Sequence, residues 1–247
     1  MLDRKKYILA SNWKANFTLE EAINWFEIVS RLNYPDLRII AAIPYPYIHY
    51  FATRYNNIDV FSQNISHVLG GAYTGEVTIS MLKSVGFRGS IVGHSERRHL
   101  FNESNQIINK KVLILQENST EIILCIGETL EERKEGKTER VLYDQIISAL
   151  NGFSRFELLT VAYEPVWAIG TGIPISPHDL TEAERFIRKI FEDKFGVKNI
   201  ILLYGGSVDK EFAKVIRNQT TLDGALIGSA SWKPHNFEEI IRIFVEH

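Results

Sequence analysis

Short apolar segments recur along the chain, and a longer segment of mixed polar and apolar positions follows each of them. The apolar segments are rich in Ile, Val and Leu and alternate little with polar residues. Such short, continuous hydrophobicity is typical of a β-strand buried on both faces, as in a parallel sheet covered by helices. We therefore predict strands at residues 7–12, 37–43, 58–62, 89–92, 121–126, 158–163, 199–204 and 223–227.

The intervening segments show the periodicity of amphipathic helices. In the first of them the apolar residues recur three and four positions apart, at Leu19, Ala22, Ile23, Phe26 and Val29. This spacing places the apolar side chains on one face of a helix, where they can pack against a sheet.

Two threonines, each followed three positions later by a glutamate, predict where helices begin. Thr18 precedes Glu21, and Thr181 precedes Glu184. A threonine hydroxyl and a glutamate carboxylate at this spacing can satisfy the free backbone N–H groups of a first helical turn.

Strand and helix alternate about eight times, without a linker or a change of composition, so we expect residues 1–247 to form one domain. Alternation of this kind predicts parallel strands with right-handed helical crossovers. Eight units in a chain of this length favour a closed, eight-stranded parallel βα barrel. An open, doubly wound sheet is the alternative, but it usually has a Gly-x-Gly-x-x-Gly turn after its first strand. Here Asn12, Trp13 and Lys14 follow the first strand.

Composition excludes several classes of protein. The 247 residues include 28 Lys and Arg against 30 Asp and Glu, and 45% of them are hydrophobic. A net charge of −2 argues against nucleic acid or an anionic membrane as the main partner. No segment approaches the roughly 18 apolar residues of a membrane-spanning helix. The single cysteine, Cys125, cannot form a disulfide within the chain, which suits a reducing compartment, so we expect a cytoplasmic location.

The residues that directly follow the predicted strands carry most of the candidate chemistry. In a closed barrel the C-terminal strand ends meet on one rim, where the active sites of such enzymes lie. These positions hold Asn12 and Lys14, Gln63 and Asn64, Gly93 to Arg97 with His94 and Glu96 among them, Cys125, Gly127 and Glu128, Glu164, Gly205 to Ser207, and Gly228 and Ser229. A barrel with only a structural role would not need this set.

Glu164 and His94 are the candidates for proton transfer. Glu164 lies between an apolar strand and Pro165-Val166-Trp167, where desolvation would raise the pKa of its carboxyl and make it a stronger base. A glutamate in an ion pair with Arg or Lys is the alternative. His94 could act as an acid or an electrophile, or be a hydrogen-bonded histidine of the core.

Two glycine-rich turns on the same rim predict a phosphate site. Gly205-Gly206-Ser207 follows the seventh strand, and Gly228-Ser229 follows the eighth. Free backbone N–H groups in such turns bind anions, and the loops after these two strands usually hold phosphate in this fold. The histidines and acidic residues show no spacing typical of metal ligands, so we expect no metal site.

Several segments resemble the triosephosphate isomerase family, in order and without a large insertion from residue 7 to about residue 245. They are NWKAN (12–16), GGAYTGE (70–76), GHSERR (93–98), CIGETLEER (125–133), AYEPVWAIGTG (162–172), YGGSV (204–208) and LIGSAS (226–231). The resemblance implies a TIM barrel that interconverts dihydroxyacetone phosphate and D-glyceraldehyde 3-phosphate in glycolysis and gluconeogenesis, without a metal or an organic cofactor.

The resemblance also implies a role for each residue at the site. Glu164 would be the base that moves a proton between C1 and C2, and His94 a neutral electrophile. Lys14 would supply positive charge, with Asn12 beside it. Glu96 lies where the family has a glutamate that supports the catalytic groups without touching the substrate. The phosphate would be bound by Gly170, Ser207, Gly228 and Ser229.

Two loops of the family have counterparts here. A lid that closes over the substrate would comprise Pro165, Val166, Trp167, Ala168, Ile169, Gly170, Thr171 and Gly172. A loop with Tyr73, Thr74 and Gly75 would reach into a second copy of the chain, which implies a homodimer.

The chain departs from the family pattern at two places. Ser229 stands where the family usually has a second glycine, and Ile173-Pro174-Ile175 replaces the usual far hinge of the lid. These departures leave open the isomerisation of another short ketose phosphate, such as a tetrose phosphate. Two further alternatives are an aldolase-like barrel with a Schiff-base lysine and a phosphate-binding barrel without catalysis.

Overall fold

Eight parallel strands form a closed barrel in the computed structural model, which describes residues 7–169 and 175–245. Each strand pairs with the next along the chain, and β8 pairs with β1, so the sheet has no free edge. The strands are β1 (Tyr7–Asn12), β2 (Leu37–Ile43), β3 (Ile58–Ser62), β4 (Gly89–Val92), β5 (Glu121–Ile126), β6 (Leu159–Tyr163), β7 (Ile201–Tyr204) and β8 (Gly224–Ile227). This confirms the predicted closed βα barrel.

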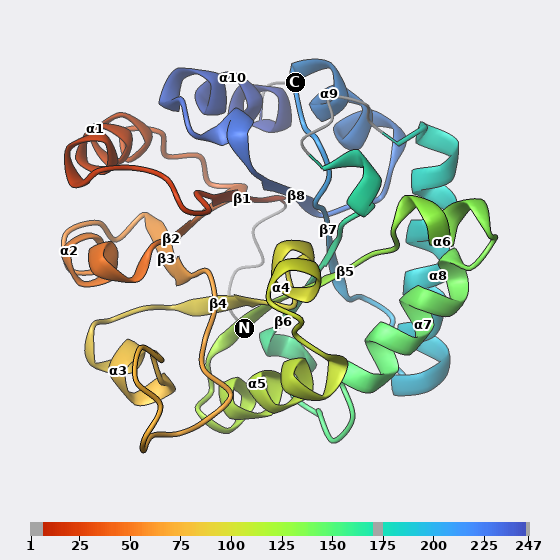
Figure 1. Cartoon of the computed structure of the whole chain (residues 1–247). Helices are drawn as coiled ribbons and strands as arrows, with labels where there is room; N and C mark the ends of the chain where they lie inside the picture. The colour runs from red at the N-terminus through yellow and green to blue at the C-terminus, as the bar shows by residue number, and fades with distance from the viewer. Residues whose placement is uncertain (1–6, 170–174, 246–247) are drawn as a thin grey trace.

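Helices surround the barrel as an outer ring (Figure 1). The α-helices are α1 (Leu19–Val29), α2 (Ile48–Ala52), α3 (Ile79–Ser84), α4 (Ser95–Leu100), α5 (Asn105–Glu117), α6 (Leu130–Lys134), α7 (Thr138–Ala149), α8 (Pro177–Phe195), α9 (Lys210–Gln219) and α10 (Pro234–Val245). Short 3₁₀ helices are η1 (Tyr45–Tyr47), η2 (Phe156–Leu158), η3 (Val166–Ala168) and η4 (Ser229–Ser231). No helix in the described part of the chain is long and apolar enough to cross a membrane.

Most of the predicted bounds are confirmed, and the errors lie at the starts of elements. The bounds of β1 to β5 match, whereas β6 to β8 begin one or two residues later than predicted. Leu158, for example, ends the 3₁₀ helix η2 instead of opening β6, and its N–H donates to the carbonyl of Arg155. Hydrophobicity continues across this boundary, so the pattern alone could not place it.

The helix start predicted at Thr18 is confirmed, and the one predicted at Thr181 is wrong. Thr18 and Glu21 form a reciprocal capping box at the start of α1. Helix α8 begins four residues before Thr181, at Pro177, and the hydroxyl of Ser176 accepts the N–H of Asp179. The hydroxyl of Thr181 donates instead to the carbonyl of Pro177, inside the helix.

Alternate residues of each strand pack on the two sides of the barrel wall. Residues such as Ile8, Ala10 and Phe61 belong to a cluster whose buried members all come from strands, so this cluster fills the barrel. Neighbouring residues such as Leu9 pack with the apolar faces of the helices in a larger cluster. Because successive side chains in a strand point to opposite faces, one continuous apolar segment supplies both layers.

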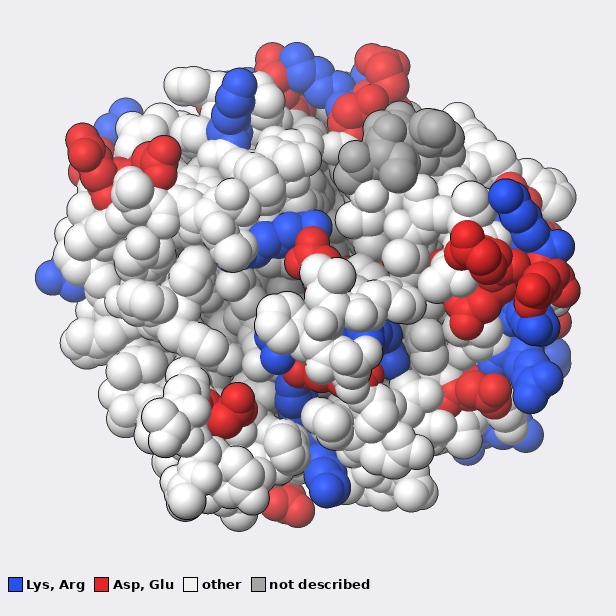
Figure 2. Space-filling view, in the orientation of Figure 1, with Lys and Arg blue, Asp and Glu red and all other residues white. Residues whose placement is uncertain are grey.

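The C-terminal ends of the strands meet on one rim, around a hollow near the middle of the face shown in Figure 2. Charged side chains of both signs lie at the edge of this hollow, whereas most of the surrounding surface is uncharged (Figure 2). The fold therefore gathers the predicted site residues from strands that are far apart in the sequence.

Candidate active site

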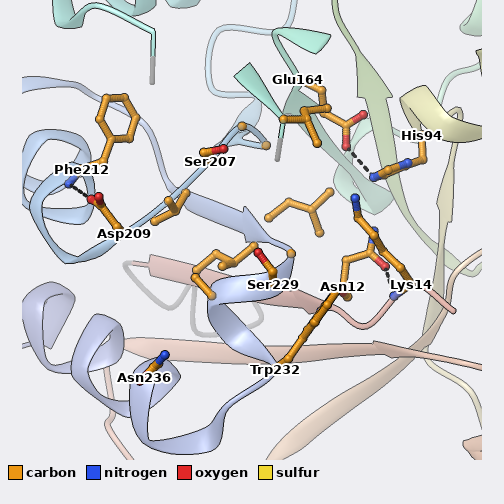
Figure 3. Close-up of a pocket in the computed structure, with 18 of the residues that line it drawn as sticks. Asn12, Lys14, His94, Glu164, Ser207, Asp209, Phe212, Ser229, Trp232 and Asn236 are labelled. Atoms are coloured by element: carbon orange, nitrogen blue, oxygen red, sulfur yellow. Dashed lines mark hydrogen bonds and ion pairs between the residues drawn. The ribbon is translucent and has the colours of Figure 1, made fainter. Parts of the chain in front are cut away.

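A cavity of about 670 Å³ opens on this rim and contains the main candidates. Asn12, Lys14, His94 and Glu164 lie on one side of it in Figure 3, and Ser207 and Ser229 border it from the β7 and β8 turns. The structure thus brings together the predicted acid–base residues and the predicted phosphate-binding turns. Gly170, which was predicted to bind phosphate, lies outside the described residues.

Glu164 follows β6 and is held between the ends of the neighbouring strands. Its backbone N–H donates to the carbonyl of Ile126, and the N–H of Gly205 donates to the carbonyl of Tyr163. A Cβ atom on Gly127 would lie 1.7 Å from the Glu164 carbonyl oxygen, and one on Gly205 would lie 2.6 Å from the Glu164 Cγ. Glycines on both sides are therefore required for Glu164 to occupy this position.

The carboxylate of Glu164 is buried, with 2% of the residue exposed, and faces His94. Its Oε2 accepts the backbone N–H of Ser95 at 3.0 Å, and its Oε1 lies 3.3 Å from His94 Nε2 (Figure 3). Within the described residues it forms no ion pair with Lys or Arg, so the alternative of a structural Arg or Lys pair is wrong. A desolvated carboxylate beside an imidazole can accept a proton from a substrate.

His94 caps the start of α4, and its hydrogen bond defines which ring nitrogen carries the proton. The Nδ1 atom accepts the backbone N–H of Glu96 at 3.2 Å. An accepting Nδ1 carries no proton, so in the neutral imidazole the proton is on Nε2. The Nε2 atom lies 3.3 Å from Glu164 Oε1 without a hydrogen bond between them, so its N–H group can donate to a substrate oxygen that enters the cavity.

Lys14 has an unusual backbone conformation that two side chains stabilise. Its φ of 53° lies in the left-handed region, which is unfavourable for a residue other than glycine. Asn12 Oδ1 accepts its N–H at 3.0 Å, and Gln63 Nε2 donates to its carbonyl at 2.8 Å. The ammonium forms an ion pair with Glu96 at 2.5 Å. The sequence places Gln63 only at the end of a strand. Its role in holding the Lys14 backbone depends on a hydrogen bond between residues far apart in the chain, which the sequence alone does not show.

The β8–η4 turn leaves backbone donors free in the cavity. Among the described residues, no acceptor bonds the N–H groups of Gly228 and Ser229. Gly228 also lies close to Lys14, because a Cβ atom there would be 3.6 Å from the lysine Cε. Free N–H groups beside an ammonium can bind an anion such as phosphate.

Ser207, in the turn after β7, is bonded to the first part of the lid. Both its N–H and its hydroxyl donate to the carbonyl of Ala168, at 3.1 and 2.6 Å. Ser207 therefore lies at the predicted phosphate end, and its backbone N–H would have to leave Ala168 to reach a ligand.

Residues 165–169, the described part of the lid, are hydrogen-bonded to the buried carboxylate of Glu128, a strand-end residue to which the sequence assigned no role. Glu128 accepts hydrogen bonds from Trp167 Nε1 at 3.2 Å and from the hydroxyl of Tyr163 at 3.1 Å. Arg133 pairs with Glu128 at 3.4 Å and lies over the Trp167 ring, 5.0 Å from its centroid. Burial raises the pKa of the Glu128 carboxyl. Gly170, Thr171, Gly172, Ile173 and Pro174 lie outside the described residues.

Two predicted features lie outside the cavity. Cys125 is fully buried inside the barrel, where burial raises the pKa of its thiol, so it acts as a packing residue. Tyr73, Thr74 and Gly75 form an exposed loop on the surface.

Comparison with known proteins identifies the family. The triosephosphate isomerase family model matches residues 7–244. A triosephosphate isomerase of Aquifex aeolicus is 40% identical over 96% of this chain and 99% of its own length. A protein of the same name in Buchnera aphidicola is 39% identical over 97% of this chain and 98% of its own length. Another, in Alkaliphilus oremlandii, is 37% identical over 96% of this chain and 99% of its own length. With its eight-stranded barrel and a family match over nearly its whole length, the chain belongs to the triosephosphate isomerase family.

Proposed function

We propose that Glu164, His94 and Lys14 carry out the reaction of this family in this chain, the interconversion of dihydroxyacetone phosphate and D-glyceraldehyde 3-phosphate. The observation that carries the proposal is the 3.3 Å separation of Glu164 Oε1 from His94 Nε2, in the cavity that Lys14 also lines. The chain is thus an aldose–ketose isomerase. Glu164 takes a proton from carbon, and His94 donates a hydrogen bond to the adjacent oxygen.

In the forward direction Glu164 takes a proton from C1 of dihydroxyacetone phosphate. The electron pair moves into the carbonyl, and an enediolate forms. His94 Nε2–H donates to the oxygen that gains negative charge, and the Lys14 ammonium stabilises the same charge. His94 gives its Nε2 proton to O2 and takes the hydroxyl proton of O1 in return, so the C1 carbonyl forms as Glu164 returns the carbon-derived proton to C2. In the structure, Glu164 Oε2 accepts a hydrogen bond from the N–H of Ser95. The carboxylate would give up this hydrogen bond when it moves to take the proton from the substrate carbon.

Protons move within one substrate in this reaction, and no net oxidation occurs. The acid and base side chains supply all the chemistry, so we propose that the enzyme works without a metal or an organic cofactor. Asn12 contributes by holding the backbone of Lys14, and Glu96 by holding its ammonium and the His94 ring.

The phosphate of the substrate would be bound by the turn after β8. The free N–H groups of Gly228 and Ser229 support this assignment, as does the nearby Lys14. Ser207 would join when its N–H leaves Ala168. Residues 165–172 would close over the bound substrate and exclude water.

A second cavity, of about 330 Å³, supports a homodimer. It adjoins the first at Asn12, Lys14 and His94, and its outer wall includes Tyr45 and Phe101. Several large apolar side chains are exposed on the same chain, including Leu69, Tyr73 and Phe101, which is 63% exposed. We propose that the Tyr73-Thr74-Gly75 loop of a second copy fills this cavity, because burying these side chains in a partner would remove apolar area from water.

We further propose that the whole chain is one catalytic domain and that it works in the cytoplasm. A continuous barrel across the described residues supports the first statement, and the lone buried Cys125 suits a reducing compartment.

An assay that couples formation of D-glyceraldehyde 3-phosphate to a dehydrogenase tests the function. Purified protein should convert dihydroxyacetone phosphate much faster than it converts the corresponding tetrose phosphate. No turnover of the triose, or faster turnover of the tetrose, would overturn the proposal. The relatives share the triose name, so the tetrose alternative is not favoured.

A further inference from the structure

Ser229 places a hydroxyl group in the active-site cavity beside the free N–H groups of the β8–η4 turn. The residue is exposed and lines the cavity, and Figure 3 shows its oxygen on the cavity side of the turn. Within residues 7–169 and 175–245 this hydroxyl forms no hydrogen bond. Its donor is therefore available to a ligand.

Two nearby serines are already bonded to the protein: Ser207, which also lines the cavity, and Ser231, which is fully buried. The Ser207 hydroxyl donates to the carbonyl of Ala168 at 2.6 Å. The Ser231 hydroxyl lies 2.7 Å from the Ser11 hydroxyl and 2.7 Å from the carbonyl of Gly228. Ser231 thus holds the turn in place, whereas the Ser229 hydroxyl has no structural role in the described protein.

Two tryptophans fix the position of the turn that carries Ser229. Trp232 Nε1 donates to the carbonyl of Asn12 at 3.0 Å, and Trp25 Nε1 donates to the carbonyl of Ser231 at 2.7 Å. A hydroxyl on a backbone anchored in this way loses little conformational freedom when a ligand binds, so more of its hydrogen-bond energy appears as affinity.

The charge around Ser229 favours an anionic acceptor. Gly228, the preceding residue, lies against the Lys14 side chain, and no acceptor among the described residues bonds the N–H group of either turn residue. A phosphate has several acceptor oxygens and no competing donor when it is doubly ionised. A serine hydroxyl and two backbone N–H groups are therefore chemically complementary to it.

We propose that the Ser229 hydroxyl donates a hydrogen bond to the phosphate of the substrate, in addition to the backbone groups and Lys14. This inference rests on the proposed function for the site and adds a side-chain contact to its phosphate end. It makes Ser229 a determinant of affinity for phosphorylated ligands.

Calorimetric binding of glycerol 3-phosphate tests the proposal, because this ligand carries the phosphate but has no carbonyl to isomerise. Ser229→Ala keeps the Cβ atom and removes the hydroxyl, and Ser229→Gly removes both. Since a hydrogen bond to a charged group contributes substantially to affinity, we expect both variants to bind about tenfold more weakly than wild type. Ser84→Ala, at the exposed end of α3, is the matched control and should bind as wild type does.

A loss of threefold or more in both Ser229 variants supports the proposal. A smaller loss in either variant, or tighter binding, overturns it. Binding is measured without turnover, so the result is independent of the proposed reaction. A wild-type protein that binds glycerol 3-phosphate through Ser229 but does not isomerise triose phosphate would contradict the proposed function and leave this inference standing.

Discussion

The Nε2 atom of His94 lies 3.3 Å from the Oε1 atom of Glu164, although the two residues follow different strands of the barrel, β4 and β6. Because Nδ1 of the same ring accepts a backbone N–H, the neutral imidazole presents a proton to the cavity at Nε2. A proton acceptor and a proton donor thus face the same small volume, as a 1,2-proton transfer beside a carbonyl requires.

Glu164→Gln should abolish most of the turnover and preserve ligand binding. The amide is nearly isosteric but cannot accept the substrate proton, and general base catalysis contributes about 10²–10⁴ in rate. We expect kcat to fall by about 10³ or more in the coupled assay. The dissociation constant of glycerol 3-phosphate should stay within about threefold. Glu157→Gln, on the exposed surface beside β6, is the control. Substantial activity in Glu164→Gln would disprove the assignment of the base.

Lys14→Gly should separate activity from stability. Glycine adopts the left-handed conformation of this position without the penalty of about 1 kcal/mol or more that a lysine pays. The ammonium is lost at the same time, so we expect kcat/KM to fall by about 10² or more. Thermal denaturation should show no loss of stability beyond about 1 kcal/mol, because the Glu96 partner is 41% exposed and stays solvated. A strongly destabilised variant would show that the Lys14 side chain is needed for folding.

The stability of the protein should depend on pH through Glu128. Burial raises the pKa of this carboxyl in the folded state above its ordinary value of 4.5, so the folded protein binds the proton more tightly than the unfolded chain does. The contribution of Glu128 to the unfolding free energy therefore falls as pH rises from the unfolded pKa through the raised folded pKa. Glu128→Gln removes this titration.

Urea denaturation between about pH 4 and about pH 8 measures the effect. The unfolding free energy of wild type minus that of Glu128→Gln should fall as pH increases, then level off once Glu128 is ionised in both states. Glu131→Gln, at an exposed position of α6, is the matched control. A difference that stays constant, or grows, over this range would contradict the raised pKa.

Glu103→Gln should be one of the more destabilising single substitutions outside the active site. Glu103 pairs with Lys111, whose side chain is only 2% exposed, and with Arg97. Burial lowers the pKa of Lys111, and the Glu103 carboxylate offsets part of this effect. Removing the carboxylate leaves a buried ammonium without its ion-pair partner, which costs about 3–5 kcal/mol.

Urea denaturation of Glu103→Gln at neutral pH gives the measurement, with Glu211→Gln as the control. Glu211 forms an exposed pair with Lys214, and exposed pairs contribute about 0–1 kcal/mol. If the two variants lost the same stability, Glu103 would not be compensating a buried charge.

The sequence by itself determined the order of the strands and the residues at their ends. The bounds of β1 to β5 could be read directly, because a strand buried on both faces has few polar residues and is followed by polar ones. The capping box at Thr18 could be read in the same way, because its partners are three residues apart. The start of β6 could not be read from the sequence, because hydrophobic residues continue across the boundary between η2 and the strand. The start of α8 could not be read either, because Ser176 and Thr181 both have side chains that can cap a helix.

The tertiary structure alone decided which of the strand-end residues act together. Lys14 and Glu96 are separated by 82 positions in the chain and yet form an ion pair, and Ser95 reaches Glu164 across 69 positions. Glu128 became visible as the acceptor of Trp167 only when β5 and β6 were paired. Local periodicity records which face of an element is buried but not what covers it. Closure of the parallel barrel brings every C-terminal strand end to one rim, and that long-range geometry fixes the distances on which proton transfer depends.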